Sequence, residues 1–234
     1  MDKKIFQKAF TATIPVISGY VVLGTAFGFL IRTAGLPAWT GPAMSMFVFA
    51  GSLQFALIPM LTGSASLFTV LLTSLVVNAR HLFYGISMLE KYKGAGPRKP
   101  YLIFGLTDET YSLVCSVPSD IPETQRLSYC FLVTVLDHFY WVFGSLLGVT
   151  LGSVLHFNTD GMDFALTALF ITVVTGQWLD NKDRRPVLAG FICSLAALLL
   201  FGPSSFLIPA MVLIAAALLL FYAADRKKEA RHDR

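Results

Sequence analysis

The sequence predicts an all-α, polytopic integral membrane protein: a bundle of eight transmembrane helices, with seven as the alternative. Hydrophobic residues make up 55% of the 234 residues and charged residues only 14%, against roughly 25% in soluble domains. The apolar residues also fall in runs close to the ~20 residues that cross a bilayer. The net charge of +4 is therefore interpreted as loop charge that orients the helices, and no nucleic-acid partner is expected.

Eight such runs follow one another along a single transmembrane domain, residues 1–234, which ends in a solvated basic tail at 225–234. The first run is too long for the apolar core of a signal peptide, so an uncleaved span is expected. The fourth is weak because it contains acidic residues, and seven spans remain without it. The expected spans are 11–31, 43–61, 66–89, 101–117, 127–155, 163–179, 187–201 and 206–223.

Basic residues decide the expected orientation, because cytoplasmic loops are enriched in Lys and Arg. The N-terminal segment, the 182–185 turn and the tail are all basic. Eight crossing spans place these three segments in the cytoplasm, so both termini are expected there. The same spans place the basic 91–99 loop outside, against the rule. A re-entrant or broken segment in the first half of the chain would remove this conflict.

An internal repeat is expected between residues 10–117 and 127–223. Secondary transporters are often built from such repeats, with the substrate site at their interface. The repeat is parallel if 101–117 crosses the membrane and inverted if it does not. A shift of 120 residues aligns a tyrosine, a GxxxG pair and a loop glycine, and after a gap of three residues it also aligns a glutamine. The pairs are Tyr20 with Tyr140, Gly24 with Gly144, Gly28 with Gly148, Gly41 with Gly161 and, after the gap, Gln54 with Gln177.

Polar groups inside the apolar runs are the candidates for function. Asn78, Arg80 and His81 lie together in 71–88. An Arg at membrane depth costs about 2.5–3.5 kcal/mol and rarely faces lipid. At 100° per residue Asn78 and His81 share one helix face, while Arg80 points elsewhere. Arg80 is therefore expected to pair with a carboxylate of the fourth or fifth span, and the sequence leaves three open: Asp108, Glu109 and Asp137.

The functional hypothesis is a substrate and proton pathway between the third, fourth and fifth spans. A carboxyl group in a low dielectric has its pKa raised towards neutrality, which suits proton transfer. The alternatives are a structural ion pair at Arg80, histidines that act as ordinary buried donors, and glutamines that only join helices. The candidate residues are Gln54, Asn78, Arg80, His81, Asp108, Glu109, Asp137, His138 and Gln177.

No motif of a soluble enzyme occurs in the sequence: there is no Walker loop, GxGxxG, HExxH, CxxC or GxSxG. Neither an enzyme nor an ATP-driven pump with its own nucleotide site is expected. No cofactor or metal is expected, since His81 with Asp108 or Asp137 is a weak ligand set. A membrane scaffold or assembly subunit, and a small-solute channel without proton coupling, are the alternatives to a transporter.

Five stretches resemble the AzlC family, and the resemblance extends from residue 8 to about residue 223. It implies the large subunit of an exporter in the bacterial inner membrane, acting with a small AzlD-like membrane partner. The implied substrates are the branched-chain amino acids leucine, isoleucine and valine, with methionine, driven outward by the proton gradient. The stretches are FAGSLQFALIPML (49–61), NARHLFYG (78–85), LTDETYSL (106–113), LDHFYWVFGSLLG (136–148) and TALFITVVTGQW (167–178).

Overall fold

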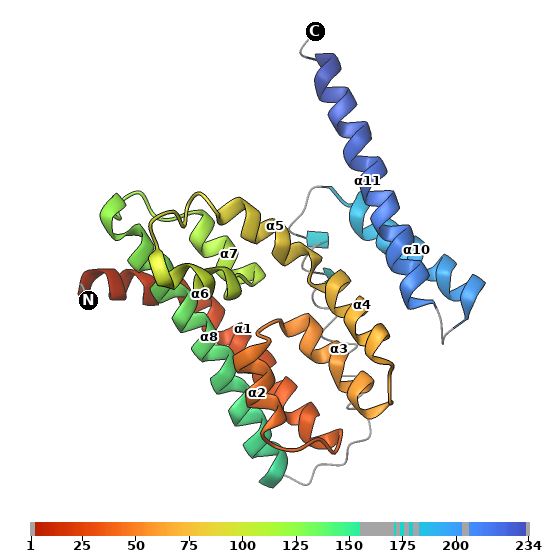
Figure 1. Cartoon of the computed structure of the whole chain (residues 1–234), viewed down its shortest axis with the longest axis horizontal. Helices are drawn as coiled ribbons and strands as arrows, with labels where there is room; N and C mark the ends of the chain where they lie inside the picture. Colours follow the sequence, from red (N-terminus) through yellow and green to blue (C-terminus); the bar gives the residue numbers. More distant parts are fainter. Residues whose placement is uncertain are drawn as a thin grey trace. The chain divides into compact units, whose positions relative to one another are not determined.

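The computed structural model is built from α-helices, as the sequence predicts, with no strand among the described residues 3–154, 171, 174–175, 178–179, 183–202 and 206–232. The chain divides into two compact units, Met1–Met162 and Asp163–Arg234. The first contains α1 (Lys3–Thr33), α2 (Thr40–Phe47), α3 (Gly51–Thr62), α4 (Leu67–Val77), α5 (Ala79–Met88), η1 (Gly96–Arg98), α6 (Lys99–Phe104), α7 (Asp108–Cys115) and α8 (Glu123–Val154); the second contains α10 (Arg185–Phe201) and α11 (Leu207–His232) (Figure 1).

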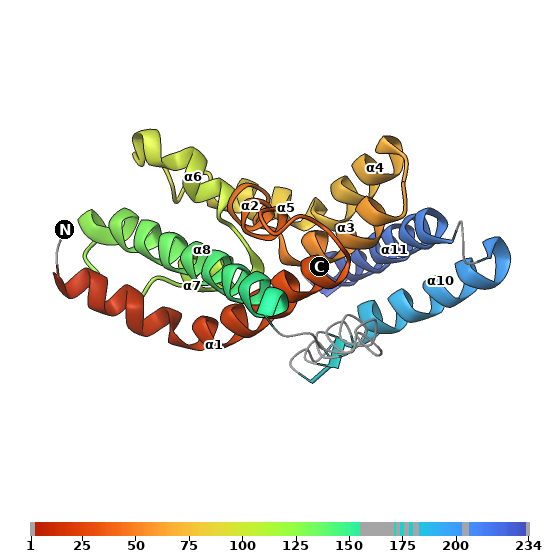
Figure 2. The same ribbon diagram turned by 90° about the horizontal axis from the view of Figure 1, so that it is seen from below.

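The first unit is organised around α1 and α8, which lie side by side and run in the same direction (Figures 1 and 2). Both are apolar and long enough to cross a membrane. A side chain at Gly24 would collide with the backbone of Trp141 and Gly144, and one at Gly144 with the backbone of Tyr20 and Val21. The two GxxxG pairs therefore face each other and let the helix backbones approach closely.

The packing of α1 on α8 is reciprocal at the 120-residue offset of the predicted repeat. Gly161 and Gln177 lie outside the described residues, so the repeat as a whole stays a prediction. The backbone groups that the second glycine of each pair contacts are themselves 120 residues apart: Ser145 and Val149 for Gly28, and Thr25 and Phe29 for Gly148.

Residues 99–115 form two short helices instead of the single span expected over 101–117, so a continuous helix there is wrong. α6 ends at Phe104 and α7 begins at Asp108. The Oγ1 of Thr107 caps α7 by accepting a hydrogen bond from the Thr110 N–H (3.2 Å), and two acidic residues follow in the first turn. This sequence starts a new helix, because an N-cap hydroxyl and negative charge both stabilise a helix N-terminus.

Both ends of the α6–α7 segment lie beside the end of α5, so the segment turns back on itself. Lys99 Nζ donates a hydrogen bond to the Leu89 carbonyl (3.2 Å). Lys91 Nζ donates to the carbonyl of Cys115 (2.9 Å) at the end of α7. A segment that enters and leaves at one end is the re-entrant arrangement that would satisfy the rule for basic loops.

The expected second span, 43–61, is also broken, so its prediction as one helix is wrong. α2 stops before Phe49, whose φ of 43° lies in the left-handed region that non-glycine residues rarely adopt. The Phe49 ring contacts Tyr20 near the middle of α1 (6.4 Å between centroids). Beyond the break, Phe55 of α3 packs on Phe27 (5.5 Å), which lies further towards the C-terminal end of α1. The α2–α3 segment thus also turns back at the break.

The expected third span, 66–89, is present as α4 and α5, which are bent by 44° at a one-residue break. Asn78 occupies the break and ends α4, with φ −92° and ψ 3°. Regular helical spacing does not continue through Asn78, so the common face of Asn78 and His81 stays a prediction. Together with α1 and α8, this bent pair makes up to three candidate spans among the described residues.

The main hydrophobic core lies at the N-terminal ends of α1 and α8. Ile5 of α1 and Tyr129 of α8 are buried there together with Tyr92 and Ala95 of the 91–99 loop. Lys8 Nζ forms an ion pair with Asp120 (2.8 Å) in the turn before α8. The basic N-terminal segment and the basic 91–99 loop therefore lie at the same end of the first unit.

In the second unit, α10 and α11 form a helical pair. They correspond to the expected spans 187–201 and 206–223, although α11 continues to His232, through much of the predicted tail. The chain turns between them at Gly202, whose φ is 72°, a value that glycine adopts readily. Most of the expected span 163–179 lies outside the described residues, and the total of eight spans stays a prediction.

Candidate functional site

The polar groups predicted from the sequence meet where the helices of the first unit break. The α2–α3 and α6–α7 breaks lie on opposite sides of one aromatic contact, since Phe49 packs on Phe104 (6.2 Å between centroids). Tyr20 lies beside both breaks: its ring contacts Phe49, and its hydroxyl hydrogen bonds to Thr107 (2.6 Å). Broken helices place free backbone groups and short side chains inside a membrane protein, as in many transporter sites.

Arg80 pairs with Asp108, which settles which of the three carboxylates receives it. The distance between Arg80 Nη1 and Asp108 Oδ2 is 2.6 Å, and the two side chains are 37% and 40% exposed. Arg80 Nη2 also donates a hydrogen bond to Ser52 Oγ (3.1 Å) in the first turn of α3. Arg80 Nε has no hydrogen-bond partner within the described part of the chain. The arginine thus joins three of the broken segments and keeps one donor unused.

A tyrosine holds the carboxylate of this pair. Tyr84 donates a hydrogen bond to Asp108 Oδ1 (2.6 Å) and stacks on Tyr111 (4.4 Å between centroids). His81 lies beside Tyr84 (5.9 Å between ring centroids) and is half-buried. Arg80, Asp108, Tyr84 and Ser52 are called the arginine cluster below.

The other two carboxylates are joined by a continuous row of oxygens. Glu109 Oε2 accepts a hydrogen bond from the Tyr20 hydroxyl (2.7 Å), which lies 2.6 Å from Thr107 Oγ1. Thr107 Oγ1 is 3.0 Å from Thr110 Oγ1, and Thr110 donates to Asp137 Oδ2 (2.8 Å). These five residues are called the carboxyl chain. It connects α7, α1 and α8 through side chains alone.

The two ends of the carboxyl chain differ in exposure. Asp137 is fully buried in the middle of α8, whereas Glu109 is exposed. Asp137 forms no ion pair with any described residue, and its Oδ1 has no partner among them. A buried carboxylate without a cation is costly. Such a group is therefore suited to accept and release a proton.

His138 follows Asp137 on α8 and contacts the α2–α3 break. Its Nδ1 lies 3.0 Å from the Tyr101 hydroxyl, and its Nε2 is 3.2 Å from the Ser45 carbonyl near the end of α2. The ring also packs against Phe49 (4.4 Å between centroids). These contacts hold the break in place, and a proton-relay role for His138 stays a prediction.

Gln54 stabilises the same break from inside α3. The side chain is fully buried, and its Oε1 accepts hydrogen bonds from Trp141 Nε1 (2.9 Å) and the Ala50 N–H (3.2 Å). Its Nε2 donates to Ser45 Oγ (3.1 Å), which bonds to Ser145 of α8 (2.5 Å). All these bonds are structural, so the geometry favours the helix-joining alternative for Gln54. Gln177, its predicted counterpart, lies outside the described residues.

Sequence reasoning missed Tyr20, Thr107, Thr110 and Tyr84, because Thr and Tyr are ordinary in membrane helices. One signal was available: Thr107 followed by two acidic residues has the pattern of a helix N-cap. No group of three or more His, Cys, Asp or Glu that could hold a metal occurs among the described residues.

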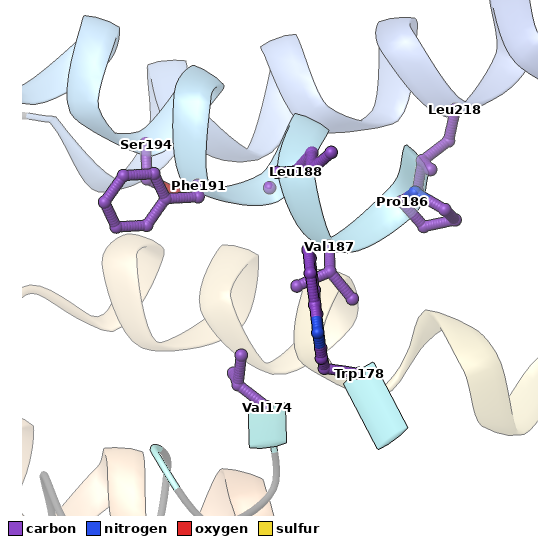
Figure 3. A pocket seen from close by; sticks show the side chains of 9 residues that line it. Val174, Trp178, Pro186, Val187, Leu188, Phe191, Ser194 and Leu218 are labelled. Carbon is purple, nitrogen blue, oxygen red and sulfur yellow. The ribbon is translucent and has the colours of Figure 1, made fainter. Parts of the chain in front are cut away.

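A separate apolar hollow of about 640 Å³ lies in the second unit. Figure 3 shows Trp178 beside Val187 at the start of α10, and Arg184 lies over the Trp178 ring (4.6 Å). The side chains that line the hollow are uncharged. They are Val174, Trp178, Pro186, Val187, Leu188, Phe191, Ser194 and Leu218, with Gly190.

The family model described as AzlC protein matches residues 15–155, which include the arginine cluster and the carboxyl chain. The chain belongs to the AzlC family. It is 42% identical to the branched-chain amino acid transport protein AzlC of Bacillus subtilis, over 96% of this chain and 88% of that protein. No solved structure matches.

The chain is also similar to membrane proteins of other organisms. An uncharacterized membrane protein of Helicobacter pylori is 38% identical over 93% of this chain and 95% of its own length. Inner membrane protein YgaZ of Escherichia coli is 26% identical over 84% and 82%. The names of these relatives and the apolar helices support a membrane protein with a role in transport. The resemblance drawn from the sequence motifs is thereby confirmed.

Proposed function

We propose that this chain is the large subunit of an exporter of branched-chain amino acids, driven by the proton gradient. The observation that carries the proposal is the Arg80–Asp108 pair inside a chain of the AzlC family. The named function of the Bacillus subtilis relative supports the substrate class. We further propose that the chain works in the bacterial inner membrane, with a small AzlD-like partner and with both termini in the cytoplasm.

The arginine cluster suits the head group of an amino acid, which carries one charge of each sign. Asp108 would receive the substrate ammonium, and Arg80 would receive the carboxylate through its planar guanidinium. Both side chains are partly exposed, so a substrate can exchange the internal ion pair for two external ones.

Transport by the purified chain in proteoliposomes, with and without the small partner, tests the proposal. We expect an imposed pH gradient to drive movement of labelled leucine or valine. We also expect unlabelled isoleucine to compete with it. A preparation that assembles correctly but moves none of these amino acids under any pH gradient would sink the proposal.

The head-group assignment has its own test. Arg80→Gln removes the guanidinium, and we expect it to weaken leucine binding by at least about tenfold, the loss of one charge-assisted contact of 1.5–3 kcal/mol. Arg98→Gln is the matched control, because Arg98 lies over the Phe131 ring (5.1 Å) outside the cluster. Equal leucine binding by wild type and Arg80→Gln would contradict the assignment.

A membrane scaffold is the second candidate, favoured by the many structural hydrogen bonds around Gln54 and His138. In a scaffold the carboxylates matter only for assembly. Asp108→Asn and Asp137→Asn would then lower the yield of the complex while leaving transport per assembled complex unchanged. An exporter predicts loss of transport in complexes that still assemble.

A further inference from the structure

The carboxyl chain contains one hydrogen-bonded contact more than its hydroxyl groups can fill. Its five oxygens form a row from Glu109 Oε2 to Asp137 Oδ2, and neighbouring oxygens in the row make four contacts of 2.6–3.0 Å. A contact of this length between two oxygens needs a hydrogen between them. The hydroxyls of Tyr20, Thr107 and Thr110 supply three hydrogens. Filling all four contacts takes a fourth, which a carboxyl group must carry.

We propose that the carboxyl chain holds one mobile proton and passes it between Glu109 and Asp137. A proton on Glu109 moves to the Tyr20 oxygen while the Tyr20 hydrogen moves to Thr107. The Thr107 hydrogen then moves to Thr110, and the Thr110 hydrogen to Asp137 Oδ2. Each hydroxyl loses and gains one hydrogen, so one proton is transferred in all. Reversal of the four steps returns it.

The surroundings suit a single shared proton. The titratable groups around Asp137 are Glu109 from α7, Tyr20 from α1, and Tyr129 and Tyr140 from α8 itself. None of them is a cation, so nothing among these groups balances a second negative charge. Two ionised carboxylates would leave one contact of the chain without a hydrogen, with two oxygens in direct repulsion.

The chain also has the placement that a coupling proton requires. Its exposed end, Glu109, is the residue after Asp108 of the arginine cluster, in the first turn of α7. A substrate that separates Asp108 from Arg80 changes the charge at that turn and therefore the proton affinity of Glu109. The inference rests on the proposed function for the identity of the substrate. The count of hydrogens in the carboxyl chain is independent of that function.

The first experiment tests the proton without any substrate. The infrared absorption of a protonated carboxyl group is recorded on the complex in membranes at neutral pH. We expect the band in wild type, and in Asp137→Asn we expect it to be lost or displaced. Wild-type protein without such a band would overturn the inference and leave the proposed function standing.

The second experiment tests the path. Thr110→Val keeps the shape but removes the oxygen, and Thr110→Ser restores it. We expect Thr110→Val to lower pH-driven leucine transport at least about tenfold, as the loss of a proton-transfer group does, and Thr110→Ser to restore it. Leucine exchange at equal pH on both sides is expected to be unchanged. Tyr20→Phe, which breaks the chain at another oxygen, is expected to behave like Thr110→Val.

Two control variants separate a broken path from a disturbed core. Thr134 is buried, and among the described residues its hydroxyl bonds only to the Cys130 carbonyl of its own helix. Tyr140 is the counterpart of Tyr20 on α8, with its hydroxyl on Thr13 (3.2 Å). Thr134→Val and Tyr140→Phe should therefore retain pH-driven transport. Full pH-driven transport in Thr110→Val would overturn the inference, whereas its absence in wild type would overturn the proton coupling of the proposed function.

Discussion

Single residues in this protein act mainly by joining segments that are far apart in the sequence. Arg80 joins α5 to α3 and α7 through Ser52 and Asp108. Gln54 joins α2, α3 and α8. At neither position does the residue type alone say which partner it has. The consequences of losing one partner are specific and can be measured.

Gln54→Leu is expected to destabilise the protein without altering the arginine cluster. The change leaves Trp141 Nε1 and the Ala50 N–H without their Gln54 partner and removes one of the two hydrogen bonds of Ser45 Oγ. Each buried polar group left unpaired costs about 1–3 kcal/mol. We expect a clear fall in Tm in detergent. Trp141→Phe removes only one of the three hydrogen bonds of the Gln54 side chain, and it should produce a smaller fall in Tm. Equal Tm values for Gln54→Leu and wild type would contradict this account.

The Lys8–Asp120 pair predicts a pH dependence of stability. The hydrogen bond from the Lys8 ammonium lowers the pKa of Asp120 below its ordinary value. A carboxyl whose pKa is lowered in the folded state stabilises it above the unfolded pKa, and loses this effect as the pH falls through the folded pKa. Asp120→Asn should therefore lower Tm slightly at neutral pH and leave it unchanged in strong acid.

The control for this prediction is Glu90→Gln, an exposed acidic residue at the same end of the first unit. It changes the net charge by the same amount without removing the Lys8 pair. A Tm difference between wild type and Asp120→Asn that persists in strong acid would show that the effect does not come from the ion pair.

At the scale of elements, the contact between α1 and α8 decides whether the first unit holds together. A Cβ at Gly28 would collide with the backbone at Ser145 and Val149, whereas the space beside Gly19 on the same helix is open. Backbone cannot rotate away as a side chain can, so Gly28→Ala must separate the helices. Overpacking of this kind costs about 1–3 kcal/mol.

We therefore expect Gly28→Ala to lower Tm and Gly19→Ala, its matched control, to leave Tm nearly unchanged. Gly148→Ala should resemble Gly28→Ala, because the two glycines make reciprocal contacts 120 residues apart. The predicted repeat requires this similarity. A tolerant Gly148→Ala together with a damaging Gly28→Ala would count against it.

At the scale of the whole first unit, the helix breaks bear on the position of the basic 91–99 loop. Eight crossing spans place this loop outside, against the rule for basic residues. With α2–α3 and α6–α7 turning back, α1, the bent α4–α5 pair and α8 are the candidate crossing elements of this unit. The 91–99 loop then lies on the same side as Lys3, Lys4 and Lys8, as the rule for basic residues requires.

Labelling of single cysteines with a membrane-impermeant reagent tests this arrangement. In a cysteine-free background, Lys93→Cys and Ser119→Cys should react from the same side of the membrane. Ala38→Cys, in the loop after α1, should react from the other side. Eight consecutive crossing spans would instead place Lys93 and Ser119 on opposite sides of the membrane. Labelling of the two cysteines from opposite sides would therefore contradict the re-entrant arrangement and support eight spans.

The sequence by itself determined that the chain is an all-helical membrane protein, where most of its apolar segments lie, and to which family it belongs. Long apolar runs have few alternatives in a bilayer. It also singled out Arg80, Asp108, Glu109 and Asp137, because charge at membrane depth is rare. Local patterns carried these conclusions.

Only the tertiary structure decided that Arg80 pairs with Asp108, and that Tyr20, Thr107 and Thr110 link Glu109 to Asp137. These contacts join residues up to 89 positions apart. They depend on where two helices break, at Phe49 and Thr107. Hydropathy does not register such breaks, since a short interruption changes the mean of an apolar run very little. The direction of the chain after each break decides which polar groups meet.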